Sequence, residues 1–137
     1  METLRLPATM ESLESFRLFV LERLHPLEPT AEMVFKVELV LEEVLTNVIH
    51  YAYPETPGEV EVGVALEPRR KLSVRVKDWG VPFNPLERPD PNLSEEVSER
   101  QVGGLGIHLI RHLVAELAYQ WREGANTLAF SFMLQGE

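Results

Sequence analysis

The 137-residue chain contains no cysteine, which excludes disulfide bridges, thiolate metal sites and thiol nucleophiles. Basic residues are also scarce, because 13 lysines and arginines stand against 22 aspartates and glutamates, a formal net charge of −9. A protein that binds nucleic-acid phosphates needs a basic face, and the one short basic cluster, 68–71, is better interpreted as a hairpin turn. The acidic surface also argues against direct docking on an anionic membrane.

Long apolar runs are missing too, and the first residues lack the apolar segment of a signal peptide. We therefore expect a soluble, cytoplasmic protein. The four histidines, His25, His50, His108 and His112, do not follow a metalloprotease or zinc-finger spacing. His108 and His112 are four residues apart and could hold a metal, but no carboxylate completes the pattern, so packed or solvated histidines are favoured.

The chain does contain 45% hydrophobic residues, enough for one core, and its length predicts a single domain over 1–137. Apolar periodicity and turn residues predict a strand at 3–6, helices at about 13–25 and 31–53, strands at 59–64 and 72–77, a loop at 81–101, a helix at about 105–117, and strands at 118–122 and 127–134. This order predicts an α/β two-layer sandwich, with a mixed, mostly antiparallel sheet of about five strands and three helices on one face.

Three local signals refine these elements. Thr30 is a good N-cap for the second helix, and Thr9 or Ser12 could cap the first. Gly124, with the two residues after it, predicts the turn between the last two strands.

The second predicted helix is apolar around most of its circumference and should be largely buried. Its polar residues Glu43, Asn47 and His50 nevertheless share one face. A carboxylate and an amide oxygen one turn apart can serve a magnesium–phosphate site, with Asn47 giving Mg²⁺ an oxygen and Glu43 orienting or deprotonating a nucleophile. Taken alone, this pair is better explained as a polar stripe at a helix boundary.

Two further polar motifs flank the predicted loop. Asp78 ends a strand, where it can accept a hydrogen bond from an exocyclic amine such as that of adenine, and Gly80 lets the backbone approach a flat ligand. Gly103, Gly104 and Gly106 open a helix, where free backbone N–H groups and the helix dipole attract anions. Each motif also has a plain structural explanation, a turn in the first case and a glycine-rich helix entry in the second.

In this order the three motifs resemble the N-box, G1 box and G2 box of the GHKL (Bergerat-fold) ATPases, with an ATP lid at about 81–102. Segments 41–49, 78–85 and 103–110 are similar to those of the compact subfamily of bacterial anti-sigma-factor serine kinases. The resemblance covers nearly the whole chain, and the three motifs are specific when taken together.

The resemblance implies a role for each motif residue. Asn47 would ligate Mg²⁺, and Glu43 would be the general base. Asp78 would bind the adenine amine, with Gly80 beneath the base. The phosphates of ATP would be wrapped by the three glycines of the G2 box, Gly103, Gly104 and Gly106.

The chain departs from the broader family at two positions. Pro82 replaces the second glycine of the D-x-G-x-G pattern, and Tyr51 stands where a histidine is often found. A kinase also benefits from a cation on the γ-phosphate, and Arg100 is the nearest candidate in the predicted lid.

The kinase members of this subfamily phosphorylate a serine of a small antagonist, an anti-anti-sigma factor, and alternatively hold a sigma factor. They are typically homodimers. The first hypothesis is therefore an ATP-dependent serine/threonine-protein kinase that acts as an anti-sigma factor. Leu18, Phe19 and Leu21 of the first helix could face a second subunit, although burial in the core is favoured.

Three alternatives stay open. The chain could be an ATP-binding regulatory module that sequesters a protein partner with little or no kinase activity. It could be an α/β interaction domain without nucleotide, in which the glycines only allow close packing. A histidine-kinase catalytic domain is a weaker alternative.

Overall fold

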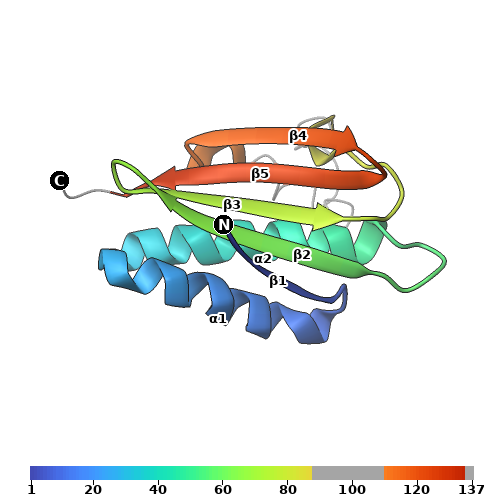
Figure 1. Cartoon of the computed structure of the whole chain (residues 1–137), viewed down its shortest axis with the longest axis horizontal. Coiled ribbons are helices and arrows are strands. Elements are labelled where there is room, and N and C mark those ends of the chain that lie inside the picture. Colours follow the sequence, from blue (N-terminus) through green and yellow to red (C-terminus); the bar gives the residue numbers. More distant parts are fainter. Residues whose placement is uncertain (88–109, 135–137) are drawn as a thin grey trace, which may run out of the picture.

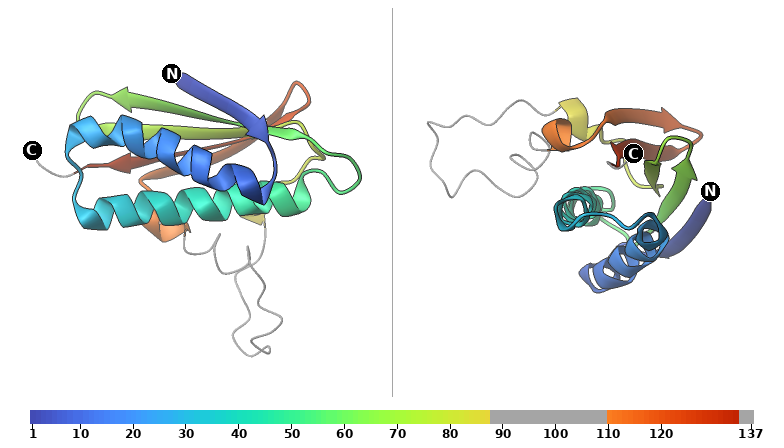
Figure 2. Two further views of the ribbon diagram at one scale, coloured as in Figure 1. Left: turned by 90° about the horizontal axis from the view of Figure 1, so that it is seen from below. Right: turned by 90° about the vertical axis from the view of Figure 1, so that its left-hand side faces the viewer.

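The computed structural model describes residues 1–87 and 110–134. A single sheet forms one layer, and two long helices form the other (Figures 1 and 2). The elements are β1 (Glu2–Pro7), η1 (Met10–Ser12), α1 (Leu13–Leu24), η2 (His25–Leu27), α2 (Ala31–Tyr51), β2 (Glu59–Glu67), β3 (Lys71–Asp78), η3 (Pro85–Glu87), β4 (Glu116–Arg122) and β5 (Ala125–Met133). Residues 110–113 are also helical.

The sheet has five strands in the order β1-β2-β3-β5-β4. All four strand pairings within the described residues are antiparallel. The predicted two-layer α/β fold with a mostly antiparallel sheet of about five strands is therefore confirmed. The basic segment 68–71 forms the expected hairpin turn, because Glu67 pairs with Lys71 and both Arg69 and Arg70 adopt positive φ.

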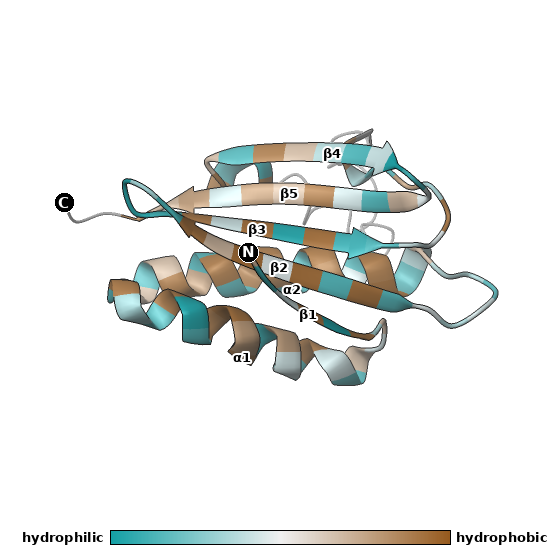
Figure 3. Cartoon of the chain, viewed as in Figure 1, coloured by the Kyte–Doolittle hydropathy of each residue, from teal (hydrophilic) through white to brown (hydrophobic). Residues whose placement is uncertain are grey.

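The core lies between the helices and the inner face of the sheet. In β2 and β3, buried valines and leucines alternate with more exposed polar residues, and Figure 3 shows the same alternation as brown and teal bands. The inward residues of the sheet and helices form one cluster, which includes Phe16, Val20, Leu24, Val37, Val40, Leu41, Val44, Val62, Val74, Val76, Phe130 and Phe132. Phe19 joins this core, as expected, whereas Leu18 is 46% exposed.

The long helix α2 begins as the sequence predicts. The Thr30 side chain accepts a hydrogen bond from the Met33 backbone N–H at 3.1 Å and so caps the helix. The helix ends at Tyr51, two residues before the expected limit of 53. Pro54 accounts for the exclusion of residue 53, because proline disfavours helical backbone at the residue before it. At the start of α1, neither Thr9 nor Ser12 makes a side-chain cap to the backbone. Within the described residues, no helix is both long enough and apolar enough to cross a membrane.

Two predictions about the last third of the chain are wrong. The helix expected to reach Leu117 ends at Leu113, and β4 already begins at Glu116. Leu117 fits a helical stripe four residues after Leu113, but it pairs instead with Phe130 of β5, and this sheet pairing overrides the local pattern.

The turn between the last two strands is also shorter than expected. It is formed by Glu123 and Gly124, both at positive φ, as a two-residue hairpin turn of type I′ requires. Ala125 and Asn126, which were predicted to belong to the turn, are buried residues of β5. This difference matters for function, because it places Asn126 beside the end of β3.

Candidate functional site

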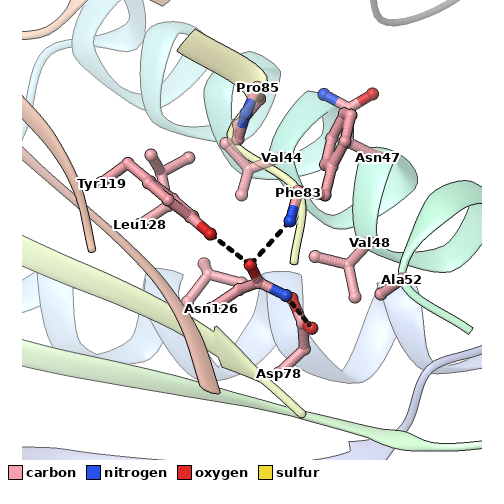
Figure 4. A pocket seen from close by; sticks show the side chains of 11 residues that line it. Val44, Asn47, Val48, Ala52, Asp78, Phe83, Pro85, Tyr119, Asn126 and Leu128 are labelled. Carbon is pink, nitrogen blue, oxygen red and sulfur yellow. Dashed lines mark hydrogen bonds between the residues drawn. The ribbon is translucent and has the colours of Figure 1, made fainter. Parts of the chain in front are cut away.

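A pocket lies between the second half of α2 and the adjoining ends of β3, β4 and β5 (Figure 4). Its empty space, which opens to solvent, amounts to about 390 Å³. Most of its lining is apolar, and a few polar groups converge on it. The residues are Val44, Asn47, Val48, Ala52, Val76, Asp78, Phe83, Pro85, Tyr119, Asn126 and Leu128.

Asp78 is the one carboxylate among the described residues of this lining, and it is only 4% exposed. It is the last residue of β3, and the strand alternation turns its side chain toward the helices. Its Oδ1 accepts hydrogen bonds from the Gly80 backbone N–H and from the Asn126 Nδ2, both at 2.9 Å. Burial raises the pKa of Asp78, and these two hydrogen bonds partly oppose the rise.

Asn126 is the residue of this site that the sequence did not reveal. It faces Asp78 across the β3–β5 ladder, since the two residues are register partners. Its Oδ1 accepts hydrogen bonds from the Phe83 backbone N–H at 3.0 Å and from the Tyr119 hydroxyl (Figure 4). Its Nδ2 also donates to the Val81 carbonyl at 2.8 Å. The signal available in the sequence was a polar amide at the start of an otherwise apolar strand. It was missed because Asn126 was predicted to belong to the turn.

Asn47 stands on the α2 wall of the same pocket (Figure 4). Its side chain is 3% exposed, and both its oxygen and its nitrogen lack a hydrogen-bond partner within the described residues. An unsatisfied buried amide costs about 1–3 kcal/mol. Such a group is a candidate for binding something that enters the pocket.

Glu43 lies one helical turn before Asn47 on α2 and is half-buried, with its Oε2 shielded from solvent. It does not belong to the described lining of the pocket. The structure therefore brings Asn47 and Asp78 together in one pocket and leaves Glu43 on the adjoining turn of the same helix.

Gly80 has a packing role that the sequence did not indicate. A Cβ atom at this position would lie 2.0 Å from the Ala52 carbonyl oxygen, so no other residue fits without a backbone shift. The neighbouring Val81 N–H donates to the same oxygen at 2.8 Å. The predicted place of Gly80 beneath a base stays a prediction, because this residue does not line the pocket.

Tyr53 also holds the turn that follows β3. Its hydroxyl accepts a hydrogen bond from the Trp79 N–H at 2.9 Å and donates one to the Glu59 carbonyl at 2.6 Å. The Trp79 ring also lies under the Arg5 guanidinium, 4.0 Å from the ring centroid. The turn that carries Asp78 is thus tied to the end of α2 and to the sheet.

Aromatic side chains cover part of the pocket. Phe83 stacks on Tyr51 of α2, with ring centroids 5.4 Å apart and an interplanar angle of 29°. Tyr51, at which the chain departs from the resembled family, therefore has a packing role here. The other departure, Pro82, lies between Val81 and Phe83, whose backbone groups both bind Asn126.

The remaining predicted site residues, Gly103, Gly104, Gly106 and Arg100, lie outside the described residues. The predicted lid is described only up to residue 87, where η3 ends. The contacts that these three glycines and Arg100 are expected to make with phosphate therefore stay predictions.

The described groups favour a flat, polar-edged ligand that donates a hydrogen bond. Asp78 accepts hydrogen bonds only through Oδ1 within the described residues, which leaves its Oδ2 as an acceptor toward the pocket. Apolar surfaces of Val44, Val48 and Leu128 line the space beside it. In the part of the chain that the structure describes, no three histidine or acidic side chains are placed to hold a metal together.

Comparison with known proteins finds relatives that are named as protein kinases. The family model described as histidine kinase-like ATPase domain matches residues 6–132. Serine/threonine-protein kinase BtrW of Bordetella bronchiseptica is 30% identical over 103 residues, which cover 74% of this chain and 72% of that protein. Serine-protein kinase RsbW of Bacillus thuringiensis is 26% identical over 134 residues, or 95% of this chain and 83% of that protein.

Solved structures agree on the fold. The structure of the RsbU and RsbW domains of Rv1364c from Mycobacterium tuberculosis aligns with a TM-score of 0.62 at 16% identity, covering 98% of this chain and 33% of that chain. The histidine kinase domain of a blue-light activated histidine kinase from Erythrobacter litoralis EL346 aligns with a TM-score of 0.54 at 25% identity, covering 75% and 45%. This chain thus spans less than half of either solved chain. Since the family model spans nearly the whole chain, from the end of β1 into the last residues of β5, the chain belongs to the histidine kinase-like ATPase domain family.

Proposed function

We propose that this chain is an ATP-dependent serine/threonine-protein kinase that acts as an anti-sigma factor in a partner-switching module. The observation that carries the proposal is the pairing of Asp78, which keeps one oxygen available, with Asn47, whose buried amide has no partner in the described residues, on opposite walls of one pocket. The names of the similar proteins BtrW and RsbW support the choice of a protein kinase.

Recognition of the base follows from the acceptor at Asp78. The exocyclic amine of adenine can donate a hydrogen bond to Asp78. A guanine ring presents a carbonyl at the same position, and two acceptors, a carbonyl and a carboxylate, cannot form a hydrogen bond with each other. The apolar side chains beside Asp78 suit the faces of the ring. We expect Gly80 to lie beneath the base.

Asn47 is the residue that fits a magnesium ion. Its carboxamide oxygen is buried, lacks a partner within the described residues and lies in the pocket, which suits a cation that takes few protein ligands and completes its shell with water and phosphate. When bound, Mg²⁺ would supply charge neutralisation for the phosphates. Gly103, Gly104, Gly106 and Arg100 are the proposed contacts to those phosphates.

Glu43 is the proposed general base. In the transfer step the hydroxyl oxygen of a substrate serine forms a bond to the γ-phosphorus while the bond from that phosphorus to the β–γ bridging oxygen breaks. The hydroxyl proton passes to the Glu43 carboxylate, and ADP leaves with the electron pair. The place of Glu43 on α2, one turn before Asn47, supports this proposal.

The proposed protein partners are a small anti-anti-sigma protein, as phosphoryl acceptor, and a sigma factor, as the alternative partner. We propose further that residues 1–137 act as one domain, that the protein is a homodimer and that it works in the cytoplasm. These assignments rest on the family resemblance, on the relatives' names and on the single core that the described residues share.

One observation favours a second candidate function, an ATP-binding regulatory module with little or no kinase activity. The described pocket is lined without Glu43, so binding of the base does not require this residue. In that case ATP would bias the protein between two partner-binding states, and transfer would be negligible.

Single-turnover transfer of labelled phosphate from ATP to a purified anti-anti-sigma protein separates the two candidates. A kinase forms phosphoserine on the acceptor, and Glu43→Gln strongly slows this transfer while ATP still binds. The matched control is Glu42→Gln, because Glu42 is the exposed neighbour on α2. ATP binding without transfer to any such acceptor would rule out the kinase, and absence of ATP binding at millimolar concentration would rule out both candidates.

A further inference from the structure

We infer that Asn126 is a positioning residue, which orients the Asp78 carboxylate so that Oδ1 is occupied and Oδ2 faces the ligand. The inference rests on the proposed function, since it deepens the account of the same nucleotide pocket. It starts from a residue whose place the sequence did not predict and which is only 6% exposed to solvent.

The orientation of the Asn126 carboxamide is set by its neighbours. A backbone N–H can only donate, so the Phe83 N–H, at 3.0 Å, identifies the atom it contacts as the carboxamide oxygen. A backbone carbonyl can only accept, so the Val81 oxygen, at 2.8 Å, identifies the other atom as the nitrogen. These two contacts exclude the flipped amide.

The fixed amide in turn sets the state of Asp78. Because Nδ2 is a donor, the atom it meets at 2.9 Å, Asp78 Oδ1, must accept. The Gly80 N–H is a second donor to the same oxygen at 2.9 Å. Two donors at Oδ1 favour the ionised carboxylate and direct the remaining lone pairs, those of Oδ2, toward the pocket.

Among the neighbours of Asp78, the Asn126 amide is the main group that opposes the effect of burial on the pKa of this carboxyl. Burial raises the pKa of this carboxyl, and the hydrogen bond from Asn126 is the largest effect that lowers it. Among the described residues that line the pocket, Tyr119 of β4 is the other titratable side chain, and Tyr53 faces Asp78 from the end of α2. Burial raises the pKa of Tyr53 above its ordinary value near 10, so this phenol keeps its proton between pH 5.5 and 8.5. Glu43 and His50 of α2 do not line the pocket.

Two substitutions at position 126 should then change the pH dependence of nucleotide binding in opposite directions. Asn126→Leu removes the donor, so the pKa of Asp78 rises further and binding is lost at a higher pH than in the wild type. Asn126→Asp places a second carboxyl within hydrogen-bond distance, and two such groups share one proton up to an elevated pH. With that proton the new carboxyl donates to Oδ1, as the amide did.

The measurement is the Kd for Mg-ADP by calorimetry between pH 5.5 and 8.5, expressed at each pH as the ratio of variant to wild type. Because protonation of the nucleotide affects the variant and the wild type equally, its contribution cancels in this ratio. Asn84→Asp is the matched control, because Asn84 lies near the pocket and its Oδ1 accepts from the Leu86 N–H at 2.9 Å, a role that a carboxylate keeps.

We expect Asn126→Asp to bind about tenfold more weakly at pH 8.5, the order of one charge-assisted hydrogen bond, and to recover as the pH falls. The ratio for Asn126→Leu should instead increase as the pH falls, and that for Asn84→Asp should stay near one. Ratios at position 126 that are independent of pH, whatever their size, would overturn the inference, because loss of packing alone weakens binding equally at every pH.

A second measurement needs no folded variant. In the wild type, the side-chain amide resonances of Asn126 should titrate together with the Asp78 carboxyl and shift when Mg-ADP is added. An Asn126 amide that is insensitive to both would overturn the inference. If the wild type binds no ADP, the proposed function fails, whereas the acid titration of the Asn126 amide still tests its coupling to Asp78.

Discussion

Gly80 lies so close to the carbonyl oxygen of Ala52 that a Cβ atom at position 80 would be only 2.0 Å from it. The Val81 N–H donates to the same oxygen at 2.8 Å. The end of α2 and the turn after β3 are therefore in direct backbone contact. Because α2 carries Asn47 and the turn follows Asp78, this contact sets the spacing between two walls of the pocket.

Gly80→Ala should lower the free energy of unfolding by about 1–3 kcal/mol, as overpacking against a backbone atom does, and should weaken ATP binding at the same time. Chemical denaturation and calorimetry measure the two effects. Gly63→Ala is the control, since its Cβ would meet chiefly the flexible end of the Met1 side chain. An alanine at position 80 that leaves both quantities unchanged would contradict the contact.

Asp78→Asn should make the protein more stable at neutral pH and should abolish selective binding of ATP. The folded-state pKa of Asp78 is raised, so the native state holds its proton more tightly than the unfolded chain. The stability that this carboxyl contributes is thus present below its unfolded pKa, near 3.9, and is lost as the pH rises through the folded value. The advantage of the amide should accordingly shrink as the pH falls toward 4.

For Glu116→Gln, the expected change of stability with pH has the opposite sign. Lys71 lowers the pKa of Glu116, so this carboxylate stabilises the fold above its unfolded pKa and ceases to do so as the pH falls. Urea unfolding at a series of pH values measures both variants. If Asp78→Asn is less stable than the wild type at pH 7, burial is not what dominates the titration of Asp78.

Asn47→Leu should stabilise the folded protein while removing magnesium-dependent nucleotide binding. The wild-type amide is buried without a partner in the described residues, and replacing it by an apolar group recovers about 1–2 kcal/mol of that cost. Thr46→Val is the control on the same helix, because the Thr46 hydroxyl already donates to the Glu42 carbonyl at 2.6 Å. A destabilised Asn47→Leu that still binds Mg-ATP would contradict the assignment.

Glu43→Gln should reduce phosphoryl transfer by about 10²–10⁴-fold, the usual contribution of a general base, and change the Kd for ATP by less than about threefold. The two constants come from quenched-flow transfer and equilibrium binding. Glu42→Gln should leave both unchanged. Equal losses in binding and transfer would mean that Glu43 holds the nucleotide and does not act on the acceptor serine.

Much of the fold could be predicted because its signals are local. Alternating valines in β2 and β3 predict half-buried strands, and Thr30 predicts the start of α2, which the Met33 N–H confirms. The predictions failed where tertiary pairing overrides a local pattern. Leu117 continues a helical spacing, and its place in β4 depends on Phe130, which comes later in the chain.

The candidate site divides in the same way. Glu43, Asn47 and Asp78 could be selected from the sequence, because polar residues inside apolar patterns stand out locally. Asn126 could not be selected, since its role depends on a neighbour 48 residues away and on a turn that proved shorter than expected. The packing role of Gly80 was hidden for the same reason, because Ala52 is distant in sequence and meets it only after the α2–β2 connection folds back.

The sequence by itself therefore determined the layers, the order of the elements and the residues able to bind a nucleotide, because these follow from hydrophobic periodicity and side-chain chemistry. Only the tertiary structure decided that Asp78 accepts hydrogen bonds through one oxygen and that Asn47 lacks a partner within the described residues. The physical reason is that hydrogen bonding and burial depend on groups brought together by the β3–β5 pairing and by α2, and not on spacing along the chain.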